Sequence, residues 1–164
     1  QAMKSLGNMY DDEERAREQL DEIQEFLKEC KKKIRCYKLP VVPRKYFVEL
    51  NEANDAIEEV VKELRRQPIE IKTLNIRVDT ARDLVLKLYN TTNDMVKTAE
   101  LAEMAIVYGN RYRSVYSDID VGLQESESMF YKGNYKNSLD KAIKTIQIVE
   151  EDIYTKLLKI YDRG

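Results

Sequence analysis

The sequence of 164 residues contains no histidine and no tryptophan, and it has only five glycines, three prolines and two cysteines. The missing histidine excludes the Glu-x-x-His ligand sets of carboxylate-bridged metal bundles, and also Ser-His and Cys-His nucleophile pairs. The scattered glycines form no phosphate-binding loop. Adjacent carboxylates such as Glu150 and Glu151 are interpreted as solubilising charge. We therefore expect no enzyme, with no catalytic residue, no metal ligand and no cofactor.

The two cysteines, Cys30 and Cys36, have a spacing that fits neither a C-x-x-C redox pair nor a zinc site. We predict two reduced thiols, with Cys30 in a helical seam and Cys36 outside it. Long apolar runs are missing as well, since none approaches the roughly 18 residues that span a bilayer. Because the sequence opens with Gln1, we expect a soluble piece of a longer protein, with any membrane anchor outside it.

Charge is abundant and balanced along the chain. The 28 basic and 30 acidic residues give a net charge of −2, and charged residues make up 35% of the sequence, against about 25% in an average soluble domain. This balance predicts no binding to nucleic acid or to an anionic membrane surface. The basic run from Lys28 to Lys38 has two interpretations, a solvated helix end or a phosphate or lipid-headgroup patch, and the acidic residues upstream favour the first.

One long helix, predicted from Pro68 to Tyr116, organises the chain. Its apolar and small residues recur at alternating steps of three and four, which is the pattern of a coiled-coil seam. The seam residues are Ile71, Leu74, Val78, Ala81, Val85, Leu88, Thr92, Met95, Ala99, Ala102 and Ile106. Such a helix would be roughly 70 Å long, so we expect an elongated fold.

Two helices are predicted before the long one, over residues 7–37 and 44–66, with the helix-breaking Pro40 and Pro43 between them. Pro68 is expected in the first turn of the long helix, where its missing N–H is harmless. The first seam contains Met9, Ala16, Leu20, Ile23, Leu27, Cys30, Ile34 and Tyr37. The second seam contains Phe47, Leu50, Ala53 (or Asn54), Ile57, Val60, Val61 and Leu64.

Two more helices are predicted after it, over residues 118–131 and 134–161. Ser117 or Asp118 is expected to cap the fourth helix, and Gly133 to adopt a left-handed conformation in the turn that follows. The fourth seam contains Val121, Leu123, Met129 and Phe130, and the fifth contains Tyr135, Leu139, Ala142, Ile146, Val149, Ile153, Leu157 and Ile160. Residues 129–143 also look like a tetratricopeptide hairpin, but one hairpin does not make a repeat array.

These helices predict an all-α protein of spectrin-like antiparallel three-helix bundles that share one long continuous helix. The first bundle is predicted to comprise residues 1–90 and the second residues 91–164.

The segment Tyr108-Gly109-Asn110-Arg111-Tyr112-Arg113 departs from the helical pattern. It places a glycine inside a helix, which costs about 1 kcal/mol relative to alanine. Tyrosine and arginine are enriched at interaction hot spots, which favours a binding surface. The other interpretation is that the tyrosines at 108, 112 and 116 complete the core against Leu123 and Phe130, while Gly109 permits close helix packing. Both interpretations stay open at this point.

Residues 102–114, followed by Phe130 to Asn134 and Leu139 to Ala142, closely resemble the C-terminal part of the EzrA family of septation ring formation regulators of Gram-positive bacteria. The resemblance is specific from about Leu84 to Asp162. It implies an N-terminal membrane-spanning helix followed by a cytosolic rod of spectrin-like bundles. It also implies a role at the division site, on the cytoplasmic side of the membrane, where the family restrains assembly of the FtsZ ring and takes part in septation.

The septal-localisation patch of the family, Gln-Tyr-Gly-Asn-Arg-Tyr-Arg, maps onto Val107 to Arg113, with Val107 in place of the glutamine. The resemblance therefore implies that Asn110, Arg111 and Arg113 carry the patch. Counting 100° per residue around a helix, we expect Arg111 with Asn110 to supply the exposed contact, and Arg113 to hold the start of the fourth helix.

The expected partners are FtsZ and other division proteins, with a homodimer as a further option and membrane contact only through the N-terminal anchor. Two other functions fit the same pattern. One is a purely structural coiled-coil spacer or dimerisation rod without a dedicated site. The other is a helical adaptor that binds peptides in the groove between the fourth and fifth helices.

Overall fold

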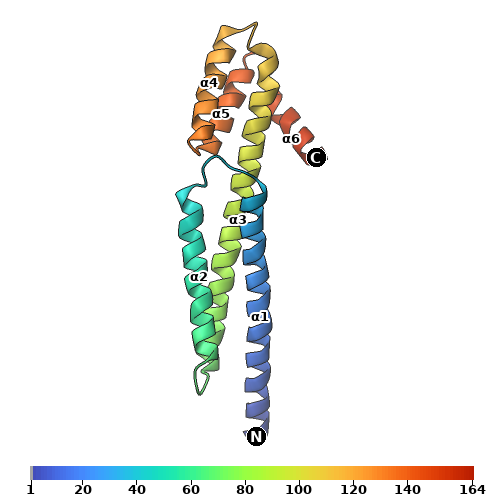
Figure 1. The fold of residues 1–164 in the computed structure, drawn as a ribbon. Helices are drawn as coiled ribbons and strands as arrows, with labels where there is room; N and C mark the ends of the chain where they lie inside the picture. The colour runs from blue at the N-terminus through green and yellow to red at the C-terminus, as the bar shows by residue number, and fades with distance from the viewer. Residues whose placement is uncertain (1) are drawn as a thin grey trace. The chain divides into compact units, whose positions relative to one another are not determined.

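The computed structural model describes residues 2–164, with side chains described from Tyr10 onward. These residues form six α-helices, one short 3-10 helix and no strand (Figure 1). The helices are α1 (Ala2–Cys36), α2 (Arg44–Leu64), α3 (Ile71–Gly109), α4 (Ser117–Tyr131), α5 (Tyr135–Ile146) and α6 (Ile153–Arg163), and the 3-10 helix is η1 (Asn110–Tyr112). The predicted all-α class is confirmed for the described residues.

The chain divides into two compact units. The first unit comprises the residues up to Cys36 together with Arg44–Thr92, and the second comprises Tyr37–Pro43 together with Asn93–Gly164. The helix α3 runs without a break from Ile71 to Gly109 and so contributes residues to both units.

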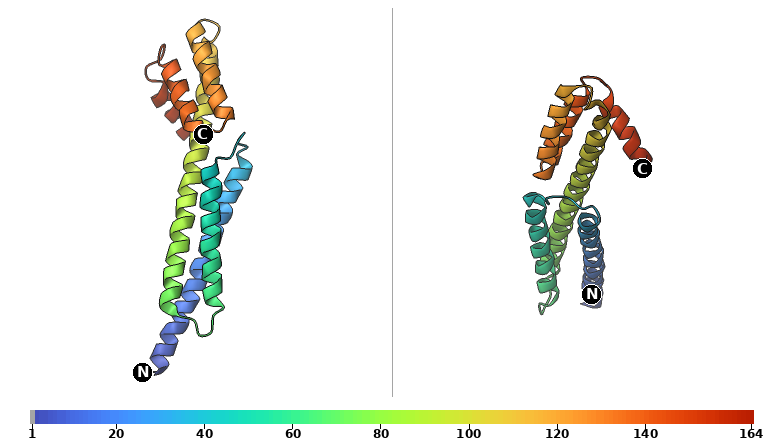
Figure 2. Two further views of the ribbon diagram at one scale, coloured as in Figure 1. Left: turned by 90° about the vertical axis from the view of Figure 1, so that its left-hand side faces the viewer. Right: turned by 45° about the horizontal axis from the view of Figure 1, so that its top comes forward.

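The first unit consists of α1, α2 and the first part of α3, which lie side by side with α1 and α2 antiparallel (Figure 1 and Figure 2). Its core follows the predicted three-and-four spacing on each helix. The buried apolar residues are Ala16, Leu20, Ile23, Leu27, Cys30, Tyr46, Ala53, Ile57, Val60, Leu64, Leu74, Val78, Ala81, Val85 and Leu88. All of them except Tyr46 were expected from the periodicity. Met9, also expected there, lies outside the residues whose side chains are described.

The prediction that Phe47 lies in the seam of the second helix is wrong. Phe47 is 49% exposed, whereas Tyr46 and Glu49 are 3% and 4% exposed. The buried positions 46, 49, 53, 57, 60 and 64 define a face on which Phe47 has no place, although phenylalanine is the more apolar residue. The ring of Phe47 instead packs edge-on against Tyr46 at the helix surface, with ring centroids 5.3 Å apart.

The long helix is shorter than predicted at both ends. It starts at Ile71, so Pro68 precedes the helix and does not lie in its first turn. The Glu63 carboxylate accepts a hydrogen bond from the backbone N–H of Glu70 at 3.3 Å, and the Glu70 carbonyl accepts the first helical bond from Leu74 at 2.9 Å. At the other end α3 stops at Gly109. The chain then forms η1, and Tyr116 beyond it has an extended backbone.

The second unit packs α4 and α5 as an antiparallel pair with the last part of α3, followed by α6 (Figure 1 and Figure 2). Its core contains Ala99, Leu101, Ala102, Ala105, Ile119, Leu123, Phe130, Tyr135, Leu139, Ala142, Ile146, Ile153 and Leu157. Gly133 has a φ of 88°, which confirms its predicted left-handed conformation. Val121, predicted in the seam, is 54% exposed, and Gly122 and Ser126 are buried on α4 instead.

The predicted start signal of α4 is also wrong, because Tyr116 occupies the N-cap position and no side chain caps this end. The connection between α4 and the preceding turn is held instead by Arg113, as described below.

The predicted fifth helix, residues 134–161, is two helices. The chain leaves α5 after Ile146, and α6 begins only at Ile153. The carbonyl of Ile146 accepts hydrogen bonds from the N–H groups of both Val149 and Glu150, at 3.0 and 2.9 Å, which closes a turn. No glycine or proline marks this break in the sequence. Ile160, predicted in the seam, lies in α6 and is 49% exposed.

Tyr37 was predicted on the seam of the first helix, but it lies beyond the end of α1 and belongs to the second unit. Its hydroxyl donates a hydrogen bond to Glu103 at 2.7 Å. The hydroxyl of Tyr135 donates to the carbonyl of Val41 and accepts from the N–H of Val41 at 3.2 Å. These bonds fix residues 37–43 onto α3 and α5 within the second unit.

Candidate functional site

The segment from Tyr108 to Arg113, called the patch below, lies where α3 gives way to η1. Gly109 is the last residue of α3, and a Cβ atom there would be 2.7 Å from Cδ1 of Leu123 and 3.0 Å from Cδ1 of Ile146. Both neighbours are fully buried. The glycine therefore lets α3 approach α4 and α5 closely, which bears out the packing interpretation of Gly109.

The two tyrosines of the patch bind one carboxylate. The Tyr108 hydroxyl lies 2.6 and 2.7 Å from the two carboxylate oxygens of Glu150, and the Tyr112 hydroxyl donates to the same group. Lys156 adds an ion pair at 3.0 Å. These donors, the tyrosine hydroxyls first and the lysine after them, lower the pKa of Glu150 to about 2. The tyrosines thus hold the α5–α6 connection through their hydroxyls.

Glu150 is the residue of this site that the sequence did not reveal. It was interpreted as solubilising charge, yet its side chain is only 14% exposed. Its partners lie 42 and 38 residues away in the sequence, and no spacing rule links positions so far apart. The adjacent Glu151 is exposed, as expected.

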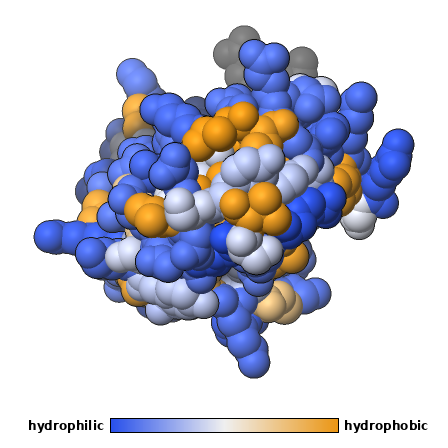
Figure 3. All heavy atoms as spheres, turned by 90° about the horizontal axis from the view of Figure 1, so that it is seen from above, coloured by the Kyte–Doolittle hydropathy of each residue, from blue (hydrophilic) through white to orange (hydrophobic). Residues whose placement is uncertain are grey.

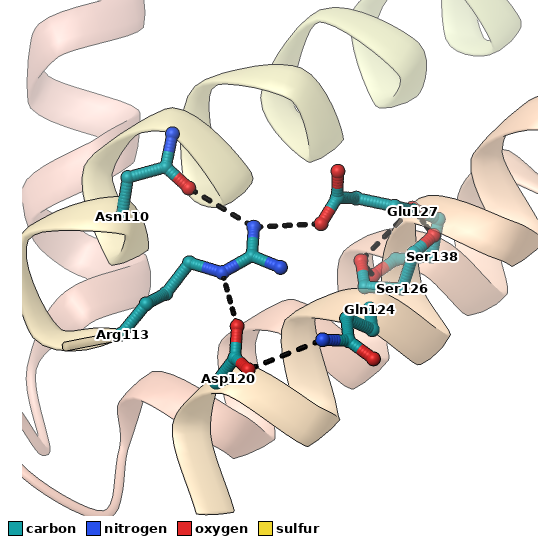
Figure 4. A network of polar contacts seen from close by, with 7 residues as sticks. All are labelled: Asn110, Arg113, Asp120, Gln124, Ser126, Glu127 and Ser138. Carbon is teal, nitrogen blue, oxygen red and sulfur yellow. Dashed lines mark hydrogen bonds and ion pairs between the residues drawn. The ribbon is translucent and has the colours of Figure 1, made fainter. Parts of the chain in front are cut away.

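Arg113 points into the second unit and binds α4. Its Nε donates to Asp120 at 2.8 Å and its Nη1 to Glu127 at 2.7 Å, with a further bond to Oδ1 of Asn110 at 3.2 Å (Figure 4). The Asp120 carboxylate, and then Glu127, raises the pKa of the Arg113 guanidinium. This geometry agrees with the expectation that Arg113 holds the start of α4.

Arg111 lies outside this network. Its guanidinium carbon is 3.7 Å from the centroid of the Tyr108 ring, and its Nε donates to the Tyr108 carbonyl at 3.1 Å. The side chain is exposed, and no carboxylate among the described residues forms an ion pair with it. Arg111 is therefore held in place by an uncharged ring and a carbonyl, with its charge uncompensated.

Two apolar residues close to Arg111 in the sequence are exposed on the second unit. Val107, one residue before the patch, is 63% exposed, and Val115, just after it, is 70% exposed. Seen from above, apolar side chains interrupt the hydrophilic surface in several places (Figure 3). Asn110 is exposed too, although its side-chain oxygen is occupied by Arg113.

A metal site and a membrane-spanning helix are absent from the residues that the structure describes. Among them, no group of three or more histidine, cysteine, aspartate or glutamate side chains could hold a metal ion. Cys30 is buried and Cys36 exposed, both as free thiols, in agreement with the prediction. Over the same residues, no helix combines the length and the apolar character needed to cross a membrane.

Comparison with known proteins gives the family. The septation ring formation regulator EzrA of Geobacillus sp. (strain WCH70) is 31% identical over 146 residues, and that of Geobacillus kaustophilus is 32% identical over 146 residues. Each alignment covers 89% of this chain and 26% of the relative. The protein of the same name from Staphylococcus epidermidis (strain ATCC 12228) is 29% identical over 148 residues, covering 90% of this chain and 26% of the relative.

The chain thus spans about a quarter of the length of these relatives, at 26%. No solved structure matches it. The model of the family described as "Septation ring formation regulator, EzrA" matches residues 1–161, nearly the whole chain. This chain therefore belongs to the EzrA family of septation ring formation regulators.

Proposed function

We propose that this chain is part of a non-enzymatic regulator of bacterial cell division that modulates assembly of the FtsZ ring and takes part in septation. Membership of the EzrA family supports the role in septation. Three further parts of the proposal are supported by the resemblance of residues 84–162 to the family. They are the action on FtsZ, an N-terminal membrane anchor in the whole protein, and a location at the septum. One observation, the environment of Arg111, connects the proposed function to particular residues.

Arg111 has the properties of a recognition residue. Its guanidinium is exposed and stacks on Tyr108, so it loses little rotamer freedom when a partner binds. It lacks a carboxylate partner among the described residues, so it offers its charge to another protein. Arginine and tyrosine are enriched at interaction hot spots, and Arg111 stacks on the ring of Tyr108. Asn110 and Arg111 are therefore the exposed contacts in this proposal, and Tyr108, Gly109, Tyr112 and Arg113 support them.

The proposed architecture is a pair of spectrin-like bundles, residues 1–90 and 91–164, that share α3, with α5 and α6 together taking the place of the third helix of the second bundle. The unbroken run of α3 from Ile71 to Gly109 supports it. A patch at the end of such a helix is presented on regular secondary structure, which fixes its geometry better than a loop would.

The test is sedimentation of FtsZ polymers in the presence of the chain. We expect the chain to reduce the amount of FtsZ in the pellet and Arg111→Ala to lose most of this effect. Arg77→Ala is the matched control, because Arg77 is also exposed on α3 but lies in the first unit. Equal pelleting with and without the chain would overturn the proposed action on FtsZ. In cells, Arg111→Ala should weaken recruitment to the septum while the Arg77 variant is recruited normally.

The alternative function is a structural spacer or dimerisation rod. It is favoured by apolar residues on the surface of the first unit, of which Phe47 is 49% and Ile76 56% exposed. A rod of this kind predicts a dimer in analytical ultracentrifugation that Ile76→Glu dissociates, and no effect of the chain on FtsZ polymers.

A further inference from the structure

The second unit carries an open groove between α3 and α6, of about 570 Å³. This volume lies within the range of ordinary ligand sites. The groove is lined by Tyr37, Glu100, Glu103, Met104, Val107, Tyr108, Arg111, Leu157 and Ile160, all of which belong to the second unit. Arg111 and Tyr108 thus belong both to the patch and to the rim of the groove.

The middle of the groove is an apolar strip. Val107 is 63% exposed on α3, and Ile160 is 49% exposed on α6, while Leu157 beneath them is buried. The lining residues Glu100, Met104 and Val107 of α3, and Arg111 of η1 just beyond it, recur at steps of three and four, so they follow one side of the chain. From the first to the last of them this side is about 16 Å long, or about three helical turns. An apolar strip of this length matches the apolar face of a short amphipathic helix.

The two ends of the groove carry opposite charges. Glu100 and Glu103 lie at one end of the side formed by α3 and η1, and Arg111 lies at the other. The Glu103 carboxylate accepts a hydrogen bond from Tyr37 at 2.7 Å, which holds it in position. Burial, and then the Glu100 carboxylate, raises the pKa of the Tyr161 hydroxyl, so Glu100 lies close to that ring.

Among the described residues, Glu100, Glu103 and Arg111 take part in no ion pair, and two lysines of the same helices have other partners. Lys97 lies over the ring of Tyr161, 5.4 Å from its centroid, and Lys156 pairs with Glu150 at 3.0 Å. The two glutamates and Arg111 can therefore form ion pairs with a bound partner. Such a partner has basic residues at one end and acidic residues at the other.

We propose that this groove binds an amphipathic helix of a partner protein, about three turns long, with apolar residues at i, i+3 or i+4, and i+7. Lysine or arginine at one end of that helix pairs with Glu100 and Glu103, and aspartate or glutamate at the other end pairs with Arg111. The proposal rests on the proposed function, because it gives the exposed Arg111 its partner, but it does not require that partner to be FtsZ.

The first experiment uses three fluorescent helical peptides of about 14 residues, about four turns, with the intact chain. The first peptide has a leucine face, lysines at one end and glutamates at the other. The second has the same leucine face with glutamates at both ends, and the third has the composition of the first with its leucines dispersed around the helix. We expect saturable binding of the first peptide in fluorescence anisotropy, with binding of the other two at least roughly tenfold weaker, or about 1.4 kcal/mol.

The second experiment places charge in the groove. Val107→Glu and Ile160→Glu should each weaken binding of the first peptide by about tenfold or more, or about 1.4 kcal/mol. Val121→Glu is the matched control, because Val121 is 54% exposed on α4 and does not line the groove. Glu100→Lys should weaken the first peptide and strengthen the peptide with glutamates at both ends. Circular dichroism confirms that each variant keeps its helix content.

The proposal is overturned if the first peptide binds no better than the other two, or if Val121→Glu weakens it as much as Val107→Glu. It is also overturned if the chain self-associates and Val107→Glu abolishes that association, because the occupant is then a second copy. FtsZ sedimentation separates the two proposals. Selective binding of the first peptide without an effect on FtsZ overturns only the proposed action on FtsZ. An effect on FtsZ without selective binding of the first peptide overturns only the proposed groove.

Discussion

Arg111 and Arg113, two positions apart, have opposite environments. Arg113 is 23% exposed and binds two carboxylates of α4, whereas Arg111 rests on the ring of Tyr108 at the surface. In a turn of 3-10 helix successive side chains are about 120° apart, so residues two positions apart differ by about 240°, which is enough to send one guanidinium inward and the other outward. The same residue type therefore stabilises the fold at one position and is free for recognition at the other.

Removing Arg113 should destabilise the second unit. Arg113→Ala loses both ion pairs to α4, and we expect its free energy of unfolding to fall by about 1 kcal/mol, with the melting temperature lower by roughly 2–4 °C. Arg111→Ala loses an exposed cation–π contact and an exposed hydrogen bond to the Tyr108 carbonyl, and we expect it to lose only about 0.5 kcal/mol because both contacts face solvent. Thermal unfolding followed by circular dichroism measures both. A larger loss in Arg111→Ala than in Arg113→Ala would contradict the assigned roles.

Glu150 makes the stability of the second unit depend on pH. Its pKa is about 2 in the folded chain and 4.5 ordinarily, so its stabilisation is present above about pH 4.5 and is lost as the pH falls toward 2. Glu150→Gln should therefore be less stable than the parent chain at pH 7, and this difference should shrink between pH 5 and pH 2. Urea unfolding at several pH values measures it, with Glu151→Gln as the matched control. A difference that is constant with pH would show that the Glu150 charge does not matter.

At the scale of elements, α4 and α5 pack more closely than helices with ordinary side chains allow. Gly122 of α4 faces Thr145 of α5, and a Cβ atom at position 122 would lie 2.6 Å from Cγ2 of that threonine. Two hydroxyls complete the contact, because the Ser126 and Ser138 side chains each donate to the other residue's carbonyl, at 2.7 and 2.8 Å. Small residues thus set the distance between the two helices.

This packing predicts an unusual response to alanine. Glycine to alanine in a helix ordinarily stabilises by about 1 kcal/mol, but Gly122→Ala should destabilise by about 1–3 kcal/mol, because the new methyl group collides with Thr145. The double variant Gly122→Ala with Thr145→Ala should be more stable than Gly122→Ala alone. Denaturant unfolding tests this, with the exposed Ser128→Ala of the same helix as control. A stabilising Gly122→Ala would mean that the helices separate at little cost.

At the scale of the whole molecule, neither compact unit is one continuous stretch of the chain. Residues 37–43 connect α1 to α2 of the first unit, yet they are grouped with the second. Tyr135 accounts for this, because its hydroxyl binds both the carbonyl and the N–H of Val41. At Gly133 a side chain would also crowd this segment, since a Cβ atom there would be 3.1 Å from Cβ of Val41.

Removing one hydroxyl should therefore weaken the attachment of residues 37–43. Tyr135→Phe leaves two backbone groups of Val41 without their partner, and we expect a loss of about 1–3 kcal/mol. Tyr131→Phe is the matched control, because Tyr131 is 66% exposed and its ring contacts only Phe130 among the described residues. Amide hydrogen exchange at Val41 should also become faster in Tyr135→Phe alone. Unchanged exchange there would rule out the role given to this hydroxyl.

The patch shows how far the sequence could predict a site. Its residues were found because a glycine, two arginines and a run of tyrosines interrupt a regular seam, and Arg113 was assigned to α4 from its angle on the helix. The acceptor of the two tyrosines was missed, because Glu150 has no local feature that separates it from Glu151. The groove beside Arg111 was missed as well, since it depends on the separate helix α6.

The sequence by itself determined the helical class, the buried positions of α1 and of α3 up to Leu88, and the left-handed turn at Gly133, because each depends on the spacing or conformation of residues within one segment. Only the tertiary structure decided that Tyr46 is buried and Phe47 exposed, that the helix breaks after Ile146, and that Tyr108 and Tyr112 both bind Glu150. The physical reason is that these outcomes depend on partners from other elements, such as Glu150 for Tyr108 and Tyr112. Hydrogen bonds and close packing between distant segments outweigh local preferences of about 1 kcal/mol per residue.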